Sequence, residues 1–369
     1  MEQLDLFGAA EEETVPATFT ARPAARPPAP PARPAPAPAR PVPAPLPDPG
    51  GLFEQPGPAL PAQRTAVPAH IRSIAALARN PRDAGQKLGE AVADTWHATS
   101  LSGHHIDIPV SIVAALALFP IKGHTADITR IITTCTDWEL IQGFREVYAH
   151  TWAQRPDLAA RMAPLMRWLT EDTDKDTVYA ARRVTETAIR YGVLELTGDP
   201  DPWHRADTDL MSWTITSLRS HGARQGLGEY HTPPEVCDFM AAMTCDDPQP
   251  GQWFHEPAGG TGGMFRSLAQ HLRHMDRDPA DFGWALNELD PIAAAGAAVN
   301  AIVWGLGTSV LISCGDTLAH ADLPERTARE RVKLIEERDE LVGRLTVASA
   351  YMEAIALADR LIRGDEKAA

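Results

Sequence analysis

Hydrophobic residues recur every three or four positions across residues 69–220, the spacing that places them on one face of an α-helix. The pattern is clear over residues 128–147, where Asp137 has a side chain favoured at helix N-caps. Residues 179–194 form another stretch of this kind. We therefore expect residues 69–220 to be a helical domain.

The pattern changes after Gly226, where short hydrophobic runs typical of strands begin to alternate with helical stretches. The strand-like runs are 252–255, 282–289 and 309–314, and the helical stretches are 234–244, 264–274 and 291–305. Such alternation predicts βα units and a parallel sheet. We therefore expect an α/β domain at residues 221–320, followed at 321–369 by charged helices that form either a hairpin or a short coiled coil.

The beginning of the chain has a different composition, because 18 of its 33 prolines lie within residues 16–68, mixed with Ala and Arg. A segment of this composition cannot bury a core, and it favours extended polyproline-like backbone. We expect a disordered Pro/Ala-rich linker at residues 16–68, about 150 Å long when fully stretched at the rise of polyproline helix. It would carry residues 1–15 at its free end.

The charge and the cysteines exclude several classes of protein. A formal net charge of −15 argues against a general polyanion binder, because non-specific nucleic-acid affinity comes from neutralising phosphates. The four cysteines show no CxxC spacing, and His104 and His105 have no third ligand at useful spacing, so we expect reduced thiols and no metal site. The acidic N-terminus is no secretory signal, and the longest apolar run, residues 108–121, is too short to span a bilayer. We expect a cytoplasmic protein without membrane contact.

A glycine-rich turn follows the first predicted strand in the run QWFHEPAGGTGGMF. The strand delivers Glu256, and Gly259, Gly260, Gly262 and Gly263 then open a helix. Glycines let the backbone approach a ligand closely, and the helix N-terminus offers unpaired N–H groups to an anionic group. The dinucleotide pattern GxGxxG and the P-loop are both absent, so the turn alone fits either a ligand site or a ligand-free strand–helix connection.

Two carboxylates at the ends of the next strands favour a nucleoside ligand. Glu288 ends the second strand, about 25 residues after the glycines, where an acidic side chain suits a ribose diol. Asp316 ends the third strand, where its carboxylate could accept from an adenine amino group. Because the carboxyl ends of parallel strands share one edge of a sheet, these groups are expected to lie together.

Four motifs in order now resemble those of one enzyme family. GEYHTPPEVCDFM, HEPAGGTGGMF, NELDP and GDTL are similar to GxYxTPxxV, [DE]PAxGTGGF, GxExDP and GDTL of the gamma-class adenine-specific DNA methyltransferases, which include the modification subunits of type I restriction systems. The resemblance covers residues 226–318 and departs at Gly259, where the family often has Cys.

The resemblance implies S-adenosylmethionine (SAM) as the methyl donor and DNA as the substrate. It also implies an α/β fold in which a helical N-terminal domain precedes a Rossmann-like methyltransferase sheet. Glu288 would hold the ribose hydroxyls and Asp316 would face the cofactor's adenine. The other residues expected at the cofactor are Tyr230, His231 and Thr232 beside the methionine part, Glu256, and the loop Gly259, Gly260, Thr261, Gly262 and Gly263.

The family's catalytic tetrapeptide, Asn/Asp-Pro-Pro-aromatic, is absent after Asp316, so we assign no catalytic residue. The nearest string, DPDPW at residues 199–203, is expected to be a turn, because too few residues follow it for a permuted order of motifs. Strands four to seven are missing as well, which makes the sheet partial and leaves the first strand with an open edge. Either the C-terminal helices cover that edge or a second chain completes the sheet.

The N-terminal peptide resembles the pentapeptide that binds the bacterial sliding clamp. In Gln3-Leu4-Asp5-Leu6-Phe7, the side chains of Leu6 and Phe7 would fill an apolar pocket, and Gln3 would hydrogen-bond beside it, next to Leu4. The alternative is an amphipathic stub without a partner.

The leading hypothesis is therefore methylation of the adenine amino group in DNA by a chain tethered to the clamp. A second hypothesis is a catalytically incomplete SAM-binding scaffold or subunit that needs a partner chain. A third, methylation of RNA, protein or a small molecule, is left open by the motifs.

Overall fold

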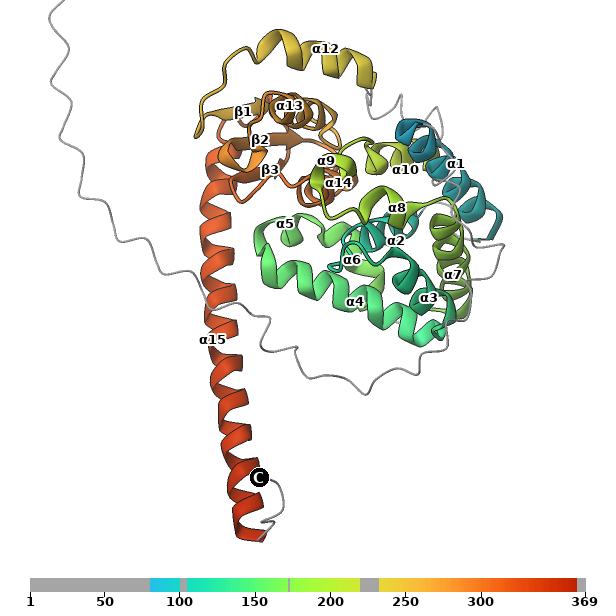
Figure 1. Ribbon diagram of the computed structural model, residues 1–369, viewed down its shortest axis with the longest axis vertical. Coiled ribbons are helices and arrows are strands. Elements are labelled where there is room, and N and C mark those ends of the chain that lie inside the picture. The colour runs from blue at the N-terminus through green and yellow to red at the C-terminus, as the bar shows by residue number, and fades with distance from the viewer. Residues whose placement is uncertain (1–79, 100–104, 172, 220–231, 364–369) are drawn as a thin grey trace, which may run out of the picture. The chain divides into compact units, whose positions relative to one another are not determined.

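The computed structural model describes residues 80–99, 105–171, 173–219 and 232–363 (Figure 1). The clamp-binding-like peptide, the proline-rich linker, Tyr230 and His231 lie outside these residues, and what the sequence predicts for them stays a prediction. None of the described helices combines the length and the apolar character that a bilayer crossing requires.

The first part of the described chain is helical. Its helices are α1 (Pro81–Thr99), α2 (Asp107–Ala117), α3 (Thr125–Thr134), α4 (Asp137–Gln154), α5 (Pro156–Arg161), α6 (Ala163–Thr170), α7 (Lys175–Arg190), α8 (Val193–Thr197), α9 (Pro202–Arg205) and α10 (Leu210–Leu218). Helix α2 is buried on nearly all sides and contacts α4, α6, α7, α8 and α10. It is therefore the centre around which the other helices pack.

Two local expectations for this region are wrong by a few residues. The N-cap of α4 is Thr136 rather than Asp137, because Thr136 and Glu139 form a reciprocal capping box. The helix expected at 179–194 is α7, which begins at Lys175 and ends at Arg190. It ends there because Gly192 takes a left-handed φ of 91° and starts the separate helix α8.

The second part alternates helices and strands as the sequence predicts. In order it contains α12 (Pro234–Thr244), β1 (Trp253–Glu256), α13 (Gly263–His274), β2 (Gly283–Glu288), α14 (Pro291–Val303), β3 (Val310–Cys314) and α15 (Leu323–Arg363), with a short 3-10 turn at Pro279–Asp281. The three strands are parallel in the order β1-β2-β3, and Trp284 of β2 pairs with Phe254 and Val310. The fold is therefore the expected α/β fold: helices followed by a small parallel sheet.

Helices cover both faces of this sheet. Phe265 of α13 packs edge-on against Trp284, whereas Ser313 of β3 hydrogen-bonds Thr327 of α15 at 2.8 Å. Because side chains alternate between the faces of a strand and Val310 shares the face of Trp284, Ser313 lies on the opposite face. Helices α13 and α15 thus lie on opposite faces.

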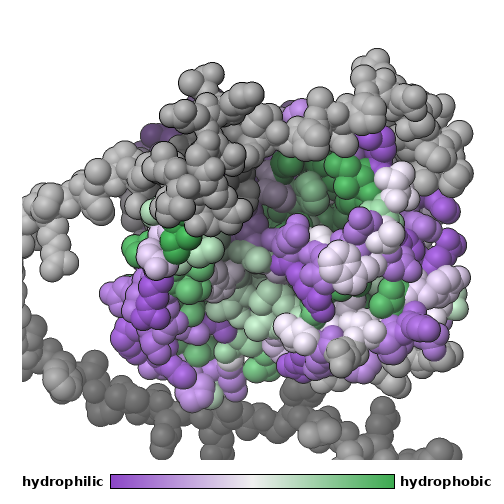
Figure 2. Space-filling view, turned by 90° about the horizontal axis from the view of Figure 1, so that it is seen from below, coloured by the Kyte–Doolittle hydropathy of each residue, from purple (hydrophilic) through white to green (hydrophobic). Residues whose placement is uncertain are grey.

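The helical part and the sheet share one hydrophobic core. A continuous cluster of buried residues runs from Leu88 and Trp96 of α1 through Val113 of α2 to Trp284 and Ile312 of the sheet. Helix α14 makes the junction, since it contacts β2 and β3 as well as α2, α5, α6 and α10. Figure 2 shows one face of the molecule, where hydrophilic residues form most of the outer surface and hydrophobic ones are seen mainly in the hollows.

The last helix does not cover the edge that sequence analysis left open. Helix α15 is one continuous helix of 41 residues, not a hairpin, and it contacts β3 and β2. On the other side, Gly283 N donates to Gln252 O, so the backbone groups of Trp253 and His255 point away from β2. Among the described residues no strand or backbone hydrogen bond meets them there, and 54% of the Trp253 surface is exposed. The free edge of β1 therefore remains available for pairing.

Candidate functional site

A cleft of about 1410 Å³ opens at the carboxyl ends of the strands. The loops after β1, β2 and β3 line it, and α10, the start of α12 and the start of α1 complete its wall. All the predicted cofactor residues that the structure describes, apart from Gly262, line this cleft: Thr232, Glu256, Gly259, Gly260, Thr261, Gly263, Glu288 and Asp316. Gly262 lies in the same loop, at the N-cap of α13.

The glycine loop passes tightly over β2. Gly260 and Gly262 have φ of 54° and 94°, a backbone conformation that residues with side chains rarely adopt. At Gly259 a Cβ would lie 2.4 Å from Cγ and Cδ1 of Leu286. The departure from the family's Cys at this position therefore has a physical reason, because the buried Leu286 fills the space a side chain would need. At Gly260 a Cβ would meet nothing within 4 Å, so this backbone is open toward the cleft.

Glu288 connects the glycine loop to the second strand. Its Oε2 accepts from Gly260 N at 2.8 Å, and its Oε1 accepts from Asp290 N at 2.8 Å. A carboxylate has about four lone-pair sites, so both oxygens can still accept from hydroxyl groups. Leu289, next in sequence, is 65% exposed and lines the cleft.

Asp316 lies in the loop after β3, with an exposed side chain. Its Oδ1 accepts from Leu318 N at 2.9 Å and Ala319 N at 3.3 Å, which shapes the turn and leaves Oδ2 without a partner among the described residues. Thr317 donates to Pro257 O at 2.7 Å and so joins this turn to the loop after β1. Leu318 is 99% exposed at the cleft wall. The predicted adenine acceptor is therefore beside an exposed apolar side chain.

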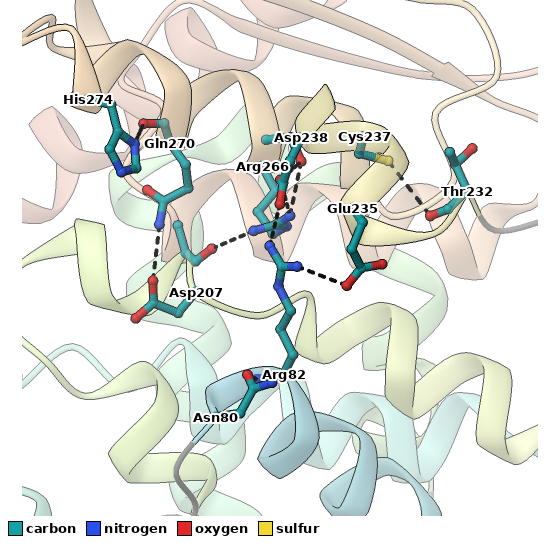
Figure 3. A network of polar contacts seen from close by, with 12 residues as sticks. Asn80, Arg82, Asp207, Thr232, Glu235, Cys237, Asp238, Arg266, Gln270 and His274 are labelled. Carbon is teal, nitrogen blue, oxygen red and sulfur yellow. Dashed lines mark hydrogen bonds and ion pairs between the residues drawn. The ribbon is translucent and has the colours of Figure 1, made fainter. Parts of the chain in front are cut away.

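A polar network that the sequence did not reveal holds α12 in place (Figure 3). Arg82 at the start of α1 pairs with Glu235 and Asp238 of α12. Asp238 also accepts from Arg266 at 2.8 Å and Ser267 at 2.6 Å, both on α13. Burial alone would raise the pKa of Asp238, but the hydrogen bonds from Ser267 and Arg82 and the charge of Arg266 hold it below its usual value. One carboxylate thus joins three helices beside the cleft.

Thr232 lies at the start of α12, and its carbonyl faces the buried thiol of Cys237, with Sγ at 3.7 Å. Burial raises the pKa of Cys237, so the thiol stays protonated. Cys237 is therefore a packing residue of the cleft wall.

Asp209 is a second cleft residue absent from the prediction. It is the N-cap of α10 and contacts Thr261 of the glycine loop and Asn300 of α14. It lies 52 and 91 residues from these partners in sequence, so no local pattern identifies it.

Several arginines make hydrogen bonds and ion pairs within the structure. Arg182 donates to the carbonyls of Ile132 and Cys135, and Arg205 donates to that of Val303. Arg219 pairs with Asp290 at the N-terminus of α14. These side chains therefore join elements of the fold.

The DPDPW string at 199–203 forms a turn and a helix cap. Asp199 accepts from Asp201 N, and Asp201 caps α9. Trp203 packs against His274 near the end of α13, with ring centroids 5.1 Å apart. The string lies away from the cleft, since none of its residues lines it.

In the described part of the chain, no group of three or more His, Cys, Asp or Glu side chains could hold a metal ion. Of the predicted histidine pair only His105 is described, and its ring lies 3.7 Å from Asp107 at the start of α2.

Comparison with known proteins finds a matching family model and similar solved structures. Residues 209–335 match the family model described as N-6 DNA Methylase. Among solved structures, the chain is similar to the crystal structure of the type I restriction-modification system methyltransferase subunit from Streptococcus thermophilus, with 13% sequence identity and a TM-score of 0.37. This match covers 64% of the present chain and 60% of that one, so the chain spans less than two thirds of that subunit's length.

Proposed function

We propose that this chain, whose residues 209–335 match the N-6 DNA Methylase family model, binds SAM in the cleft and takes part in methylating the adenine amino group of DNA. The observation that carries the proposal is the cleft itself. Glycine backbone and two carboxylates from three neighbouring parallel strands line one space at the carboxyl edge of the sheet. Parallel α/β sheets bind nucleotide-like ligands at this edge.

The residues present fit the cofactor. Glu288 offers two carboxylate oxygens for the ribose hydroxyls, and the free Oδ2 of Asp316 suits the adenine amino group. The exposed side chains of Leu289 and Leu318 give the adenine ring apolar surface near these carboxylates. The open backbone at Gly260 admits the ligand closely. Thr232, at the start of α12, would border the methionine part, with Tyr230 and His231 just before it in sequence.

When bound, SAM supplies an electrophilic methyl group to a nucleophilic nitrogen. This chain's residues would orient the cofactor, and the walls from α1, α10 and α12 would limit the access of water to it. We assign no residue to the target base, because the family's tetrapeptide is absent from residues 1–369.

Transfer of a labelled methyl group tests the proposal. The purified chain is incubated with SAM labelled in its methyl group and with unmethylated DNA, and label in N6-methyladenine is measured. Label in adenine supports the proposal. Label in RNA or protein supplied instead of DNA, with none in DNA, would favour the third hypothesis of the sequence analysis.

A second candidate function is a SAM-binding subunit that needs a partner chain, and the free edge of β1 favours it. Trp253 and His255 expose unpaired backbone groups on that edge, while α15 contacts β3 and β2. A parallel strand added there would place its carboxyl end beside Glu256, at the mouth of the cleft. If the isolated chain binds SAM and transfers label only after lysate of the source organism is added, the incomplete subunit is the correct function. Transfer by the chain alone would exclude it.

We propose in addition that residues 3–7 tether the chain to the sliding clamp. The sequence alone supports this proposal, through the near-consensus peptide and the long linker behind it. A tether raises the effective concentration of the body near DNA, which would help a chain with a net charge of −15.

A further inference from the structure

Asp209 lies where the helical part, the glycine loop and α14 meet. Its Oδ1 accepts from Ser212 N at 2.9 Å and from Asn300 Nδ2 at 2.8 Å, and its Oδ2 accepts from Thr261 Oγ1 at 2.7 Å. Asn300 Nδ2 also donates to Thr261 O at 2.9 Å. Thr261 is therefore held through both its hydroxyl and its carbonyl.

The polar side chains that hold Thr261 lie largely in the protein interior. Thr261 and Asn300 are each 2% exposed, and Asp209 is half-buried at the wall of the cleft. A buried carboxylate costs free energy unless donors surround it, and here a backbone N–H, a hydroxyl and an amide all point at it. A helix cap alone needs only the first of these donors. The hydroxyl and the amide come from the two segments that flank β2 and reach the cleft.

Thr261 lies in the middle of the glycine loop, so hydrogen bonds to it restrict the backbone on both sides. It stands between Gly260 and Gly262, both at positive φ, where glycine backbone has many other conformations available. The same backbone turn directs Gly260 N toward Glu288 at 2.8 Å. Fixing Thr261 therefore also fixes the N–H group that holds the ribose-binding carboxylate.

We propose that Asp209 is a positioning residue, which holds the glycine loop in its ligand-binding shape through Thr261 and Asn300. The expected effect on SAM affinity rests on the proposed function, whereas the geometry of the glycine loop does not depend on that function. It also gives the helical part a role at the site, since Asp209 caps α10.

The test uses a matched pair of valine substitutions in the full-length chain. Thr261→Val removes the hydroxyl while keeping the shape of the side chain, and Thr261→Ser keeps the hydroxyl. Thr177→Val is the control, because Thr177 Oγ1 donates to Asp174 at 2.9 Å at an exposed helix cap away from the cleft. Thermal unfolding first establishes that all three variants fold.

Two readouts follow: SAM affinity by calorimetry, and hydrogen exchange of the peptide containing Gly260, measured without SAM. We expect Thr261→Val to weaken SAM binding at least tenfold and to speed exchange in the loop, Thr261→Ser to retain most of the affinity, and Thr177→Val to match the parent. Unchanged exchange and affinity in Thr261→Val would overturn the proposal. If the parent binds no SAM, the proposed function fails, and the exchange measurement alone decides whether Asp209 and Thr261 position the loop.

Discussion

Single residues at the cleft have roles that depend on backbone conformation and burial. Gly260 and Gly251 make this visible, since both have positive φ, 54° and 86°, and a Cβ at either would meet nothing within 4 Å. Gly260 borders the cleft, whereas Gly251 lies in the turn before β1 and does not. Substitutions at these two positions therefore distinguish the effect of backbone strain from the effect of a blocked ligand site.

We expect Gly260→Val to weaken SAM binding at least tenfold, because a branched side chain there enters the cleft and strains the loop. Gly251→Val introduces similar strain, about 1–3 kcal/mol for a non-glycine residue at positive φ. It should lower thermal stability and leave SAM affinity unchanged. Calorimetry of both variants checks this, and equal loss of affinity would show that the effect of Gly260→Val is only structural.

The charge of Asp209 should give stability a characteristic dependence on pH. Burial raises the pKa of Asp209, and this outweighs the hydrogen bonds from Ser212, Thr261 and Asn300, which lower it. The folded protein then keeps this proton to a higher pH than the unfolded chain, so stability falls as pH rises between the two pKa values. Nearby, the charge of Arg266 also lowers the pKa of Asp209, and the Cys237 thiol, whose pKa burial raises, stays protonated in this range.

Urea unfolding from about pH 3 to pH 7 tests this with Asp209→Asn, which carries no charge. Relative to the parent, the variant should gain stability as pH rises above about 4, the ordinary value for Asp. Asp174→Asn is the control of opposite sign, because the hydrogen bond from Thr177 N lowers the pKa of Asp174. There the parent should lose stability relative to the variant as pH falls below about 4, the ordinary value for Asp. A pH-independent difference for Asp209→Asn would contradict the account.

Helix α12 is held by α13, the next helix in sequence, and by α1, which is distant in sequence. It contacts α13 extensively and reaches α1 through Arg82. Arg82 and Arg266 share Asp238, yet the Arg266 side chain is 4% exposed and that of Arg82 is 28% exposed. Arg266 also donates to Ala206 O at 3.3 Å.

We expect Arg266→Met to lower the free energy of unfolding by about 3 kcal/mol, as when one partner of a buried ion pair is removed. Arg82→Met should cost about 1 kcal/mol or less, since exposed pairs are screened by solvent. Urea unfolding of both variants measures the difference. Equal losses would mean that burial does not set the strength of this network.

The elements themselves were largely predictable, for a physical reason. Strands 252–255, 282–289 and 309–314 were expected and appear as β1, β2 and β3 within one or two residues. The runs of β2 and β3 are recognisable because buried parallel strands leave compact hydrophobic runs. The glycine loop and Glu288 stand out because their chemistry is local. Asp209 and Arg82 do not, because their partners in other elements are 52 or more residues away and only folding brings them together.

For the whole chain, we propose a body that binds the cofactor and an N-terminal peptide that binds the clamp through a linker. If residues 3–7 bind the clamp, Leu6→Ala with Phe7→Ala should abolish clamp binding and leave SAM affinity unchanged. The matched control is Leu52→Ala with Phe53→Ala, the same dipeptide within the linker. The affinity of both variants is measured on surface-immobilised clamp. Loss of binding in neither variant, or no affinity of a peptide of residues 1–10 at high micromolar concentration, would contradict the tether.

The proposed function depends on SAM binding in the cleft at the carboxyl edge of the sheet. Calorimetric titration of SAM into the full-length chain and into Glu288→Ala tests it most directly. We expect saturable one-to-one binding by the parent and at least tenfold weaker binding by the variant, since hydrogen bonds to a charged acceptor contribute about 1.5–3 kcal/mol. Absence of binding by the folded parent, or equal affinity in Glu288→Ala, would contradict it.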